Sequence, residues 1–390
     1  MRYAVLYFAH FLAFGVYNPY LPLYLSRQVG LSQSQIGSVL ALFGAMGLAG
    51  PFLWGPITDR TSRRRMLLVA GFAMSGALYP LYLAVGGMAQ VVPLAIAMGL
   101  VMTPLAPLLD DMLLRHIRAT GGEYGRTRLW GSAAFIVGSM AAGWLLGRGF
   151  VRSQFAIFAA AEAAAIAVIL AFPDREVNYR AAERKDLHFW RALSGPFVVF
   201  LVAAFLGRVA SAGYYAFFSL YLESIGVGDS MKGVAWALGV VAEIGMMLVA
   251  GRILRRIGAY RLFLWGLVGS AVRYALYAVW PTATGAMVGQ LLHSFAFGAF
   301  FIGGVTVVSE FSPPGRTATG QLAFSALCLG AGNTIGSLVS GYVADLWGYR
   351  AMYLASAALA VAASLVALAV ARRVTAPAAA AAEVEAVRAT

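Results

Sequence analysis

The chain has 390 residues, of which 61% are hydrophobic and only 12% are charged, and its mean hydropathy is +0.77. Soluble domains carry about 25% charged residues, so this composition excludes a water-soluble enzyme, a disordered protein and a nucleic-acid-binding module. The formal net charge of +13 is expected here from the cytoplasmic loops of a membrane protein rather than from binding to nucleic acid.

Apolar runs separated by turn or charge signals predict twelve membrane-spanning helices, because each span needs about 20 apolar residues. The expected spans lie near residues 4–25, 34–57, 66–87, 90–114, 129–147, 151–172, 194–222, 232–254, 260–280, 283–309, 317–344 and 350–371. The polar stretch 173–192 predicts a cytoplasmic linker between an N-terminal six-helix bundle at 1–172 and a C-terminal six-helix bundle at 193–372. Residues 373–390 are expected to form a cytoplasmic tail.

The charges in the loops predict the orientation. With the N-terminus placed in the cytoplasm, 22 of the 29 Lys and Arg residues fall on the cytoplasmic side and five on the opposite side. Both termini are therefore expected in the cytoplasm. Only Arg2 precedes the first apolar run and no cleavage site interrupts that run, so it is interpreted as a retained helix rather than a signal peptide. The Ala- and Arg-rich composition, with only two lysines, suggests a GC-rich bacterial genome, and the expected location is the bacterial inner membrane.

The first motif is the segment 55–65, GPITDRTSRRR, between the second and third spans. It resembles the signature cytoplasmic loop of the major facilitator superfamily, with Ser62 where that family usually has glycine. The resemblance implies a tight turn whose charges bridge helix ends and separate when two halves of the molecule rock. The implied gating residues are Gly55, Asp59, Arg60, Arg64 and Arg65. The alternative is simple anchoring of the loop by its positive charges.

Short matches between the two halves support the same family. Leu23-Tyr24-Leu25 recurs as Leu220-Tyr221-Leu222, and Gly125-Arg126-Thr127 recurs as Gly315-Arg316-Thr317. These matches predict a duplicated six-helix unit, so the expected fold class is an all-α polytopic membrane protein with twelve transmembrane helices in two pseudo-symmetric bundles. In such transporters the solute site lies between the repeats near the middle of the membrane.

The second motif places Asp110 three residues after Pro107, and Arg128 at the start of the following span. This spacing resembles the lactose permease and phenylpropionate permease branch of the superfamily. The resemblance implies that Asp110 pairs with Arg128 and contacts the solute. Asp111 is about 100° further round the helix, so both aspartates cannot face the same site equally. The alternative for the pair is a purely structural ion pair.

Four further charges lie inside predicted spans, where ionised groups are costly and normally face a wet cavity or a partner. They are Glu162, Arg208, Glu243 and Arg273. Glu162 is expected to be buried against a neighbouring helix. Arg208 either balances Glu162 or meets an anionic solute.

Arg273 and His293 are 20 residues apart, which resembles the spacing of an arginine and a histidine in the proton relay of lactose permease. That relay has a glutamate three residues after its histidine, where this chain has Ala296. The resemblance therefore implies that another acid carries the proton. Glu243 is favoured over Asp110, with His293 carrying or tuning the proton.

Helical spacing also groups candidates for contact with a solute. His10, Phe14, Tyr17 and Asn18 share one face of the first span, and Arg208, Ser211, Tyr215 and Phe218 share one face of the seventh. Each stripe is either core packing or part of a pocket for a ring-bearing solute. The predicted substrate-binding set is Asp110, Arg128, Arg208, Arg273, Tyr17, Asn18 and Tyr215, and the predicted proton-coupling set is Glu243, His293 and Asp110.

The single cysteine, Cys328, and four scattered histidines form no metal motif, and there is no P-loop. We therefore expect no cofactor, no metal and no enzymatic activity. The sequence predicts a monomeric secondary active transporter in the lipid bilayer that takes up a small organic solute together with protons by alternating access. The favoured solute is an aromatic or other organic acid. The alternatives are a sugar or nucleoside symporter, a drug or metabolite exporter, or a membrane protein that does not transport.

Overall fold

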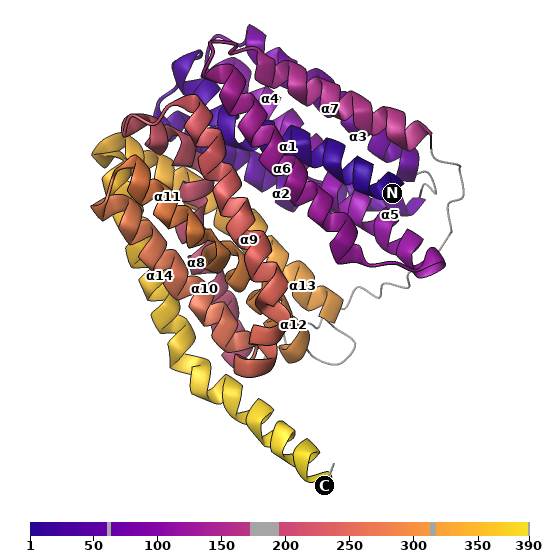
Figure 1. The fold of residues 1–390 in the computed structure, drawn as a ribbon, viewed down its shortest axis with the longest axis vertical. Coiled ribbons are helices and arrows are strands. Elements are labelled where there is room, and N and C mark those ends of the chain that lie inside the picture. Colours follow the sequence, from indigo (N-terminus) through magenta and orange to yellow (C-terminus); the bar gives the residue numbers. More distant parts are fainter. Residues whose placement is uncertain (61–63, 172–194, 313–316, 389–390) are drawn as a thin grey trace.

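The computed structural model describes residues 1–60, 64–171, 195–312 and 317–388, which form helices joined by short turns (Figure 1). The N-terminal half contains α1 (Arg2–Arg27), α2 (Gln33–Arg60), α3 (Arg64–Leu78), η1 (Tyr79–Ala84), α4 (Met88–Met102), α5 (Leu105–Thr120), α6 (Tyr124–Leu146) and α7 (Ser153–Leu170). The C-terminal half contains α8 (Gly195–Ser224), α9 (Asp229–Ile257), α10 (Ala259–Val279), α11 (Ala283–Leu291), η3 (Ser294–Ala299), α12 (Phe300–Phe311), α13 (Thr317–Ser325), η4 (Ala326–Gly332) and α14 (Asn333–Arg388). The predicted linker at 173–192 lies outside the described residues.

Nine helical segments within the described residues are long and apolar enough to cross a membrane. One of them, 319–369, bends at Gly348, where φ is +79°, and this left-handed conformation is accessible mainly to glycine. The two sides of that bend count as separate spans, which makes ten within the described residues. With α1 and α2, which have 26 and 28 residues, the number agrees with the twelve predicted spans. The end of α14 continues as a helix that projects away from the bundles (Figure 1).

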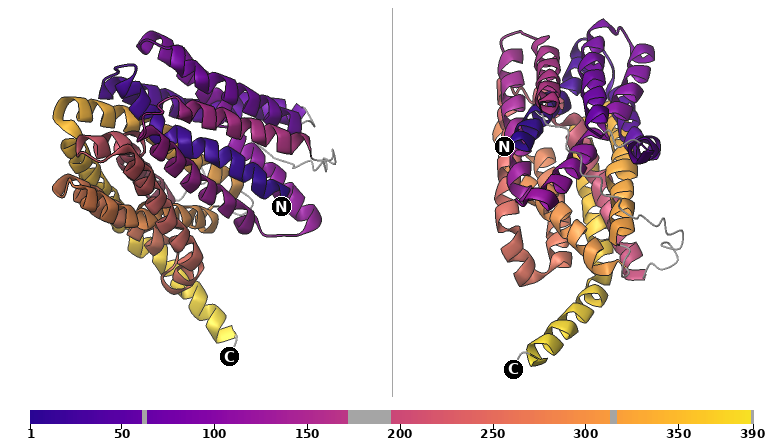
Figure 2. Two further views of the ribbon diagram at one scale, coloured as in Figure 1. Left: turned by 45° about the horizontal axis from the view of Figure 1, so that its top comes forward. Right: turned by 90° about the vertical axis from the view of Figure 1, so that its right-hand side faces the viewer.

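The buried apolar side chains show how the two halves meet. One cluster spans both halves and includes Leu25 at the end of α1 and Leu222 at the end of α8. Toward the opposite end each half has its own cluster, around Phe72 in the N-terminal half and around Phe263 in the C-terminal half. The halves are therefore packed together at one end, which we call the closed end, and they diverge toward the other (Figures 1 and 2).

Glycines allow backbones of opposite halves to approach at the closed end. A Cβ atom on Gly37 of α2 would lie 2.6 Å from the carbonyl oxygen of Ser337 in α14. A Cβ atom on Gly233 of α9 would lie 2.5 Å from the carbonyl oxygen of Ser139 in α6. Neither gap admits a larger side chain without a shift of backbone, so this end depends on small residues for its packing.

Candidate functional site

Arg273 of α10 is the centre of a buried polar cluster in the C-terminal half, and the residue is only 1% exposed. Its Nε donates to the hydroxyl of Tyr277 at 2.9 Å, one Nη donates to Oε1 of Gln290 at 2.9 Å, and the other lies 2.8 Å from Nδ1 of His293. The guanidinium carbon also lies 3.8 Å from the centre of the Tyr214 ring. Each of the three guanidinium nitrogens thus has one uncharged partner, and an aromatic face lies against the group.

These contacts fix the state of His293. An arginine only donates hydrogen bonds, so Nδ1 of His293 must accept, and the ring proton of the neutral imidazole then sits on Nε2. That atom lies 3.7 Å from Oε2 of Glu243 in α9. The side chain of Glu243 is 13% exposed, whereas that of His293 is 6% exposed. Glu243 is therefore the acid at the accessible end of a chain that runs through His293 to Arg273.

Two departures from regular α-helix occur beside these residues. His293 directly precedes the π-helical turn η3, and Asn333 directly follows the π-helical turn η4. Such turns are rare and are frequently found at functional sites. Gly239 of α9 provides the necessary space opposite, because a Cβ atom there would lie 2.5 Å from Oε1 of Gln290.

Arg208 of α8 lies in the same half and has a different environment. One Nη donates to Oδ1 of Asn333 at 3.0 Å, and the guanidinium carbon lies 4.6 Å from the centre of the Tyr215 ring. Its Nε is buried and has no hydrogen-bond partner within the described residues. The Tyr215 ring centre is in turn 6.1 Å from that of His293. Tyr215 therefore lies between Arg208 and the Glu243–His293 pair.

In the N-terminal half, Asp110 of α5 accepts hydrogen bonds from two tyrosines. The hydroxyl of Tyr7 in α1 donates to Oδ1 of Asp110, and the hydroxyl of Tyr124 in α6 donates to the same oxygen at 3.0 Å. Arg128 instead lies over the ring of Phe11, with its guanidinium carbon 4.2 Å from the ring centre. The predicted ion pair between Asp110 and Arg128 is not formed, because Tyr7 occupies the position beside the carboxylate.

Arg128 also lies within electrostatic range of an acid that belongs to the other half. Arg128 of α6 is the charged side chain that acts electrostatically on Glu243 of α9, although the two are not in an ion pair. Helices α6 and α9 pack against each other between the halves. The structure thus places Arg128 of the N-terminal half and Glu243 of the C-terminal half near the interface between the halves. The neighbours of Glu243 in the C-terminal half are Arg208, Tyr215, Arg273 and His293.

The other predicted residues are placed elsewhere. Tyr17 is buried among the rings of Phe43, Tyr79 and Phe158 in the N-terminal half. Asn18 is half-buried. Tyr17 therefore belongs to the core of its own bundle rather than to the group around Arg128 and Glu243.

Glu162 of α7 is fully buried, and its nearest ionisable atom is Nδ1 of His10 in α1, at 3.5 Å. Neither carboxylate oxygen of Glu162 forms a hydrogen bond with the described residues. Arg208 does not balance Glu162, because its guanidinium instead donates to Asn333 of α14. The partner of Glu162 is His10.

Two of the predicted gating arginines bind within the N-terminal half. Arg64 of α3 forms an ion pair with Asp111 of α5, with its Nε 3.0 Å from Oδ2. Arg65 donates to the carbonyl oxygens of Ile169 and Leu170 at the end of α7, at 2.9 and 2.5 Å. The side chains of Asp59 and Arg60 and the surroundings of Gly55 lie outside the described part of the structure.

Charged residues join the halves at the closed end. Arg27 of α1 binds both Glu223 at the end of α8 and Asp229 at the start of α9. Lys232 of α9, which is 1% exposed, lies 2.6 Å from Asp229 and 3.2 Å from Glu223. Hydrogen bonding to Asp229 raises the pKa of Arg27 further above its ordinary value, and burial opposes this only in part. The sequence interpretation missed this cluster, because its members lie at the ends of helices that are far apart in the chain.

Asp345 of α14 makes a second polar connection between the halves at the same end. It accepts hydrogen bonds from the Ser34 hydroxyl at 2.5 Å and from the Gln33 backbone N–H at 3.3 Å. The closed end therefore has two polar connections, one from α1 to α8 and α9, and one from α2 to α14.

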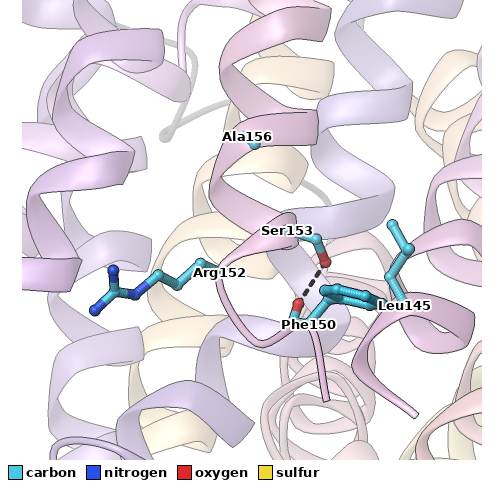
Figure 3. A pocket seen from close by; sticks show the side chains of 5 residues that line it. All are labelled: Leu145, Phe150, Arg152, Ser153 and Ala156. Carbon is cyan, nitrogen blue, oxygen red and sulfur yellow. Dashed lines mark hydrogen bonds between the residues drawn. The ribbon is translucent and has the colours of Figure 1, made fainter. Parts of the chain in front are cut away.

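A surface hollow of about 340 Å³ lies between the end of α6 and the start of α7. It is lined by Leu145, Phe150, Arg152, Ser153 and Ala156 (Figure 3). Figure 3 shows the Arg152 side chain pointing away from Leu145 and Phe150, so the hollow has mainly apolar walls. It lies apart from the group around Glu243 and has no ionisable cluster of its own.

Some partners of the candidate site were not predicted, although the sequence holds a signal for two of them. Tyr277 follows Arg273 by four residues and Gln290 precedes His293 by three, so each lies one helical turn from a predicted residue. Tyr7 and Asn333 carry no such signal, because they come from helices distant in the chain.

Comparisons with known proteins show which family and which fold this chain resembles. Residues 1–355 match the family model described as the MFS_1 like family. The chain is 28% identical over 372 residues to a maltose permease of Geobacillus stearothermophilus, covering 95% of this chain and 94% of that protein. It is 24% identical over 345 residues to a probable 3-phenylpropionic acid transporter of Escherichia coli, covering 88% and 90%. The crystal structure of the nucleoside transporter NupG superposes with a TM-score of 0.84 at 19% identity, covering 94% and 98%.

Proposed function

The chain belongs to the MFS_1 like family of the major facilitator superfamily and is a multi-span membrane transporter rather than an enzyme, and from this premise we propose that it takes up a small organic solute together with protons. The proposed location is a bacterial inner membrane with both termini in the cytoplasm. The proposed solute is an aromatic or other organic acid, and transport proceeds by alternating access.

The observation that carries proton coupling is the chain from Glu243 through His293 to Arg273. A proton carrier must bind and release a proton while it is alternately accessible, which suits an acid that is mostly but not fully buried. Protonation of His293 would require breaking its contact with Arg273, because both ring nitrogens would then be donors. Glu243 is therefore the proposed carrier, and His293 and Arg273 position it.

The position of Glu243 supports coupling to the movement of the two halves. An ionised Glu243 attracts Arg128 across the interface, and a protonated Glu243 does not. Loading the proton would thus weaken one attraction between the halves. The closed end, with Arg27 bound to Asp229, corresponds to the predicted outer side, so this state would open toward the cytoplasm.

The experiment measures proton movement in proteoliposomes that contain the purified full chain and a pH-sensitive dye outside. Aromatic acids, nucleosides and disaccharides are added in turn. We expect one class to cause external alkalinisation that a protonophore abolishes. Glu243→Gln should reduce this signal at least tenfold while solute exchange persists, because an amide keeps the shape of the site and cannot carry a proton.

Glu123→Gln is the matched control, since Glu123 is exposed beside the first turn of α6. Alkalinisation by a disaccharide or a nucleoside would favour the sugar or nucleoside symporter, which the maltose permease likeness keeps as the second candidate. Absence of a proton signal with every class, in folded protein, would contradict symport and favour export, which is then tested by drug tolerance of expressing cells.

A further inference from the structure

The group around Glu243 contains more positive than negative charge. Arg128, Arg208 and Arg273 contribute three guanidiniums, and Glu243 contributes one carboxylate. No carboxylate lies within 4.0 Å of any of the three guanidiniums in the described parts of the chain. Unpaired charge away from water is costly, so this group is complete only when an anion joins it.

The three arginines differ in their ability to receive that anion. Arg273 is 1% exposed and already donates to Tyr277, Gln290 and His293. Arg128 lies over the ring of Phe11 and within electrostatic range of Glu243. Arg208 has a single hydrogen bond, to Asn333, and its buried Nε has no partner within the described residues.

The surroundings of Arg208 favour a planar anion with an attached ring. Asn333 and the Tyr215 ring hold the guanidinium in place, and its buried Nε lacks the acceptor that a carboxylate would supply. The half-buried ring of Phe297 lies 6.4 Å from Tyr215 and stacks on Phe301 at 5.6 Å. A ring joined to a carboxylate would pack against these aromatic faces while its charge meets Arg208.

We propose that Arg208, positioned by Asn333 and Tyr215, is the anion receptor of the transport site, and that the solute is a small ring-bearing monocarboxylate. Its carboxylate accepts hydrogen bonds from Nε and Nη of Arg208, and Arg273 makes no contact with it. This inference rests on the proposed transport function, narrows the solute to a ring-bearing monocarboxylate and adds the residue that selects it.

The test is equilibrium binding to the purified full chain without a proton gradient. Each of several aromatic monocarboxylates, among them 3-phenylpropionate, is compared with its primary amide, which keeps the ring and shape but lacks the charge. We expect the wild type to bind at least one acid about 30-fold more tightly than its amide, the size of effect expected for a charge-assisted hydrogen bond. Arg208→Gln should remove this preference, and Arg208→Lys should retain part of it.

Arg148→Gln is the matched control, because Arg148 stacks on Trp144 at the closed end with a 3.6 Å distance to the ring centre. Equal binding of acids and amides, unchanged acid preference in Arg208→Gln, or no binding of any acid by the wild type would overturn the proposal. The wild-type comparison needs no variant, so misfolding of Arg208→Gln does not affect it. Acid binding without proton movement would contradict symport but would support Arg208 as the anion receptor. Proton movement with neutral solutes alone would support symport but would contradict the proposed anion receptor.

Discussion

Arg27 and Asp229 come from opposite halves of the chain, 202 residues apart, and both Nη atoms of the arginine donate to the aspartate at 2.8 Å. The Nε of the same arginine donates to Glu223 at 2.9 and 3.0 Å. One side chain thus ties α1 to the end of α8 and the start of α9. In a protein whose halves rock, this cluster has to break whenever the closed end opens.

Replacing Arg27 should favour opening of the closed end. We expect Arg27→Gln to shift the balance between closed and open states about fivefold, since partly exposed ion pairs contribute about 1 kcal/mol. The measurement is the distance distribution between spin labels on cysteines introduced at the exposed positions Gln28 and Ser224, in a Cys328→Ser background. An unchanged distribution in Arg27→Gln would show that the ion pairs do not hold this end.

The glycines at the interface give a second prediction with a control on the same helix. Gly233→Ala should destabilise the closed state by about 1–3 kcal/mol, because the new methyl group meets the backbone of Ser139. A Cβ atom on Gly245 of α9 meets nothing within 4 Å, so Gly245→Ala should leave the closed state unchanged. The same pair of spin labels measures both variants, and equal behaviour of the two would contradict the steric argument.

The neutral partners of Arg273 predict that lysine cannot replace it. A lysine offers one compact ammonium group, whereas the acceptors on His293, Gln290 and Tyr277 surround a planar guanidinium. We expect Arg273→Lys to lower the free energy of unfolding by about 2 kcal/mol, at about 1 kcal/mol for each of two lost hydrogen bonds. Transport should fall more than tenfold.

The melting temperature in detergent and proteoliposome uptake are the two readouts for Arg273→Lys. Arg261→Lys, at an exposed position of the same helix, serves as the control and should change neither. Full transport by Arg273→Lys would mean that the geometry around His293 does not matter.

The buried pair of His10 and Glu162 predicts unequal effects of its two single variants. His10→Phe leaves the carboxylate of Glu162 without its ionisable partner, which should destabilise the fold by about 3 kcal/mol. Glu162→Gln removes the charge and should cost much less. The double variant should be more stable than His10→Phe alone, and thermal unfolding of all four proteins completes the cycle. Additive losses would argue against an interaction between the two side chains.

The pattern of apolar runs was sufficient to predict the helical membrane fold. Runs of about 20 apolar residues form helices in a bilayer whatever their neighbours, because every backbone group must be satisfied within the segment. The same reasoning identified Glu243, Arg273 and His293, since ionisable groups inside such runs are rare and costly. Arg273 and His293 do contact each other, at 2.8 Å.

Which side chains meet across helices was decided by the tertiary structure. Asp110 and Arg128 have the spacing of a pair, yet Tyr7 of α1 takes the place beside the carboxylate. Glu162 meets His10 rather than Arg208. The local pattern specifies that a helix forms and which of its residues are polar, but the rotation and packing of each helix determine the partners. Contacts such as Arg27 with Asp229 therefore depend on how the two halves pack, which no local segment of the sequence encodes.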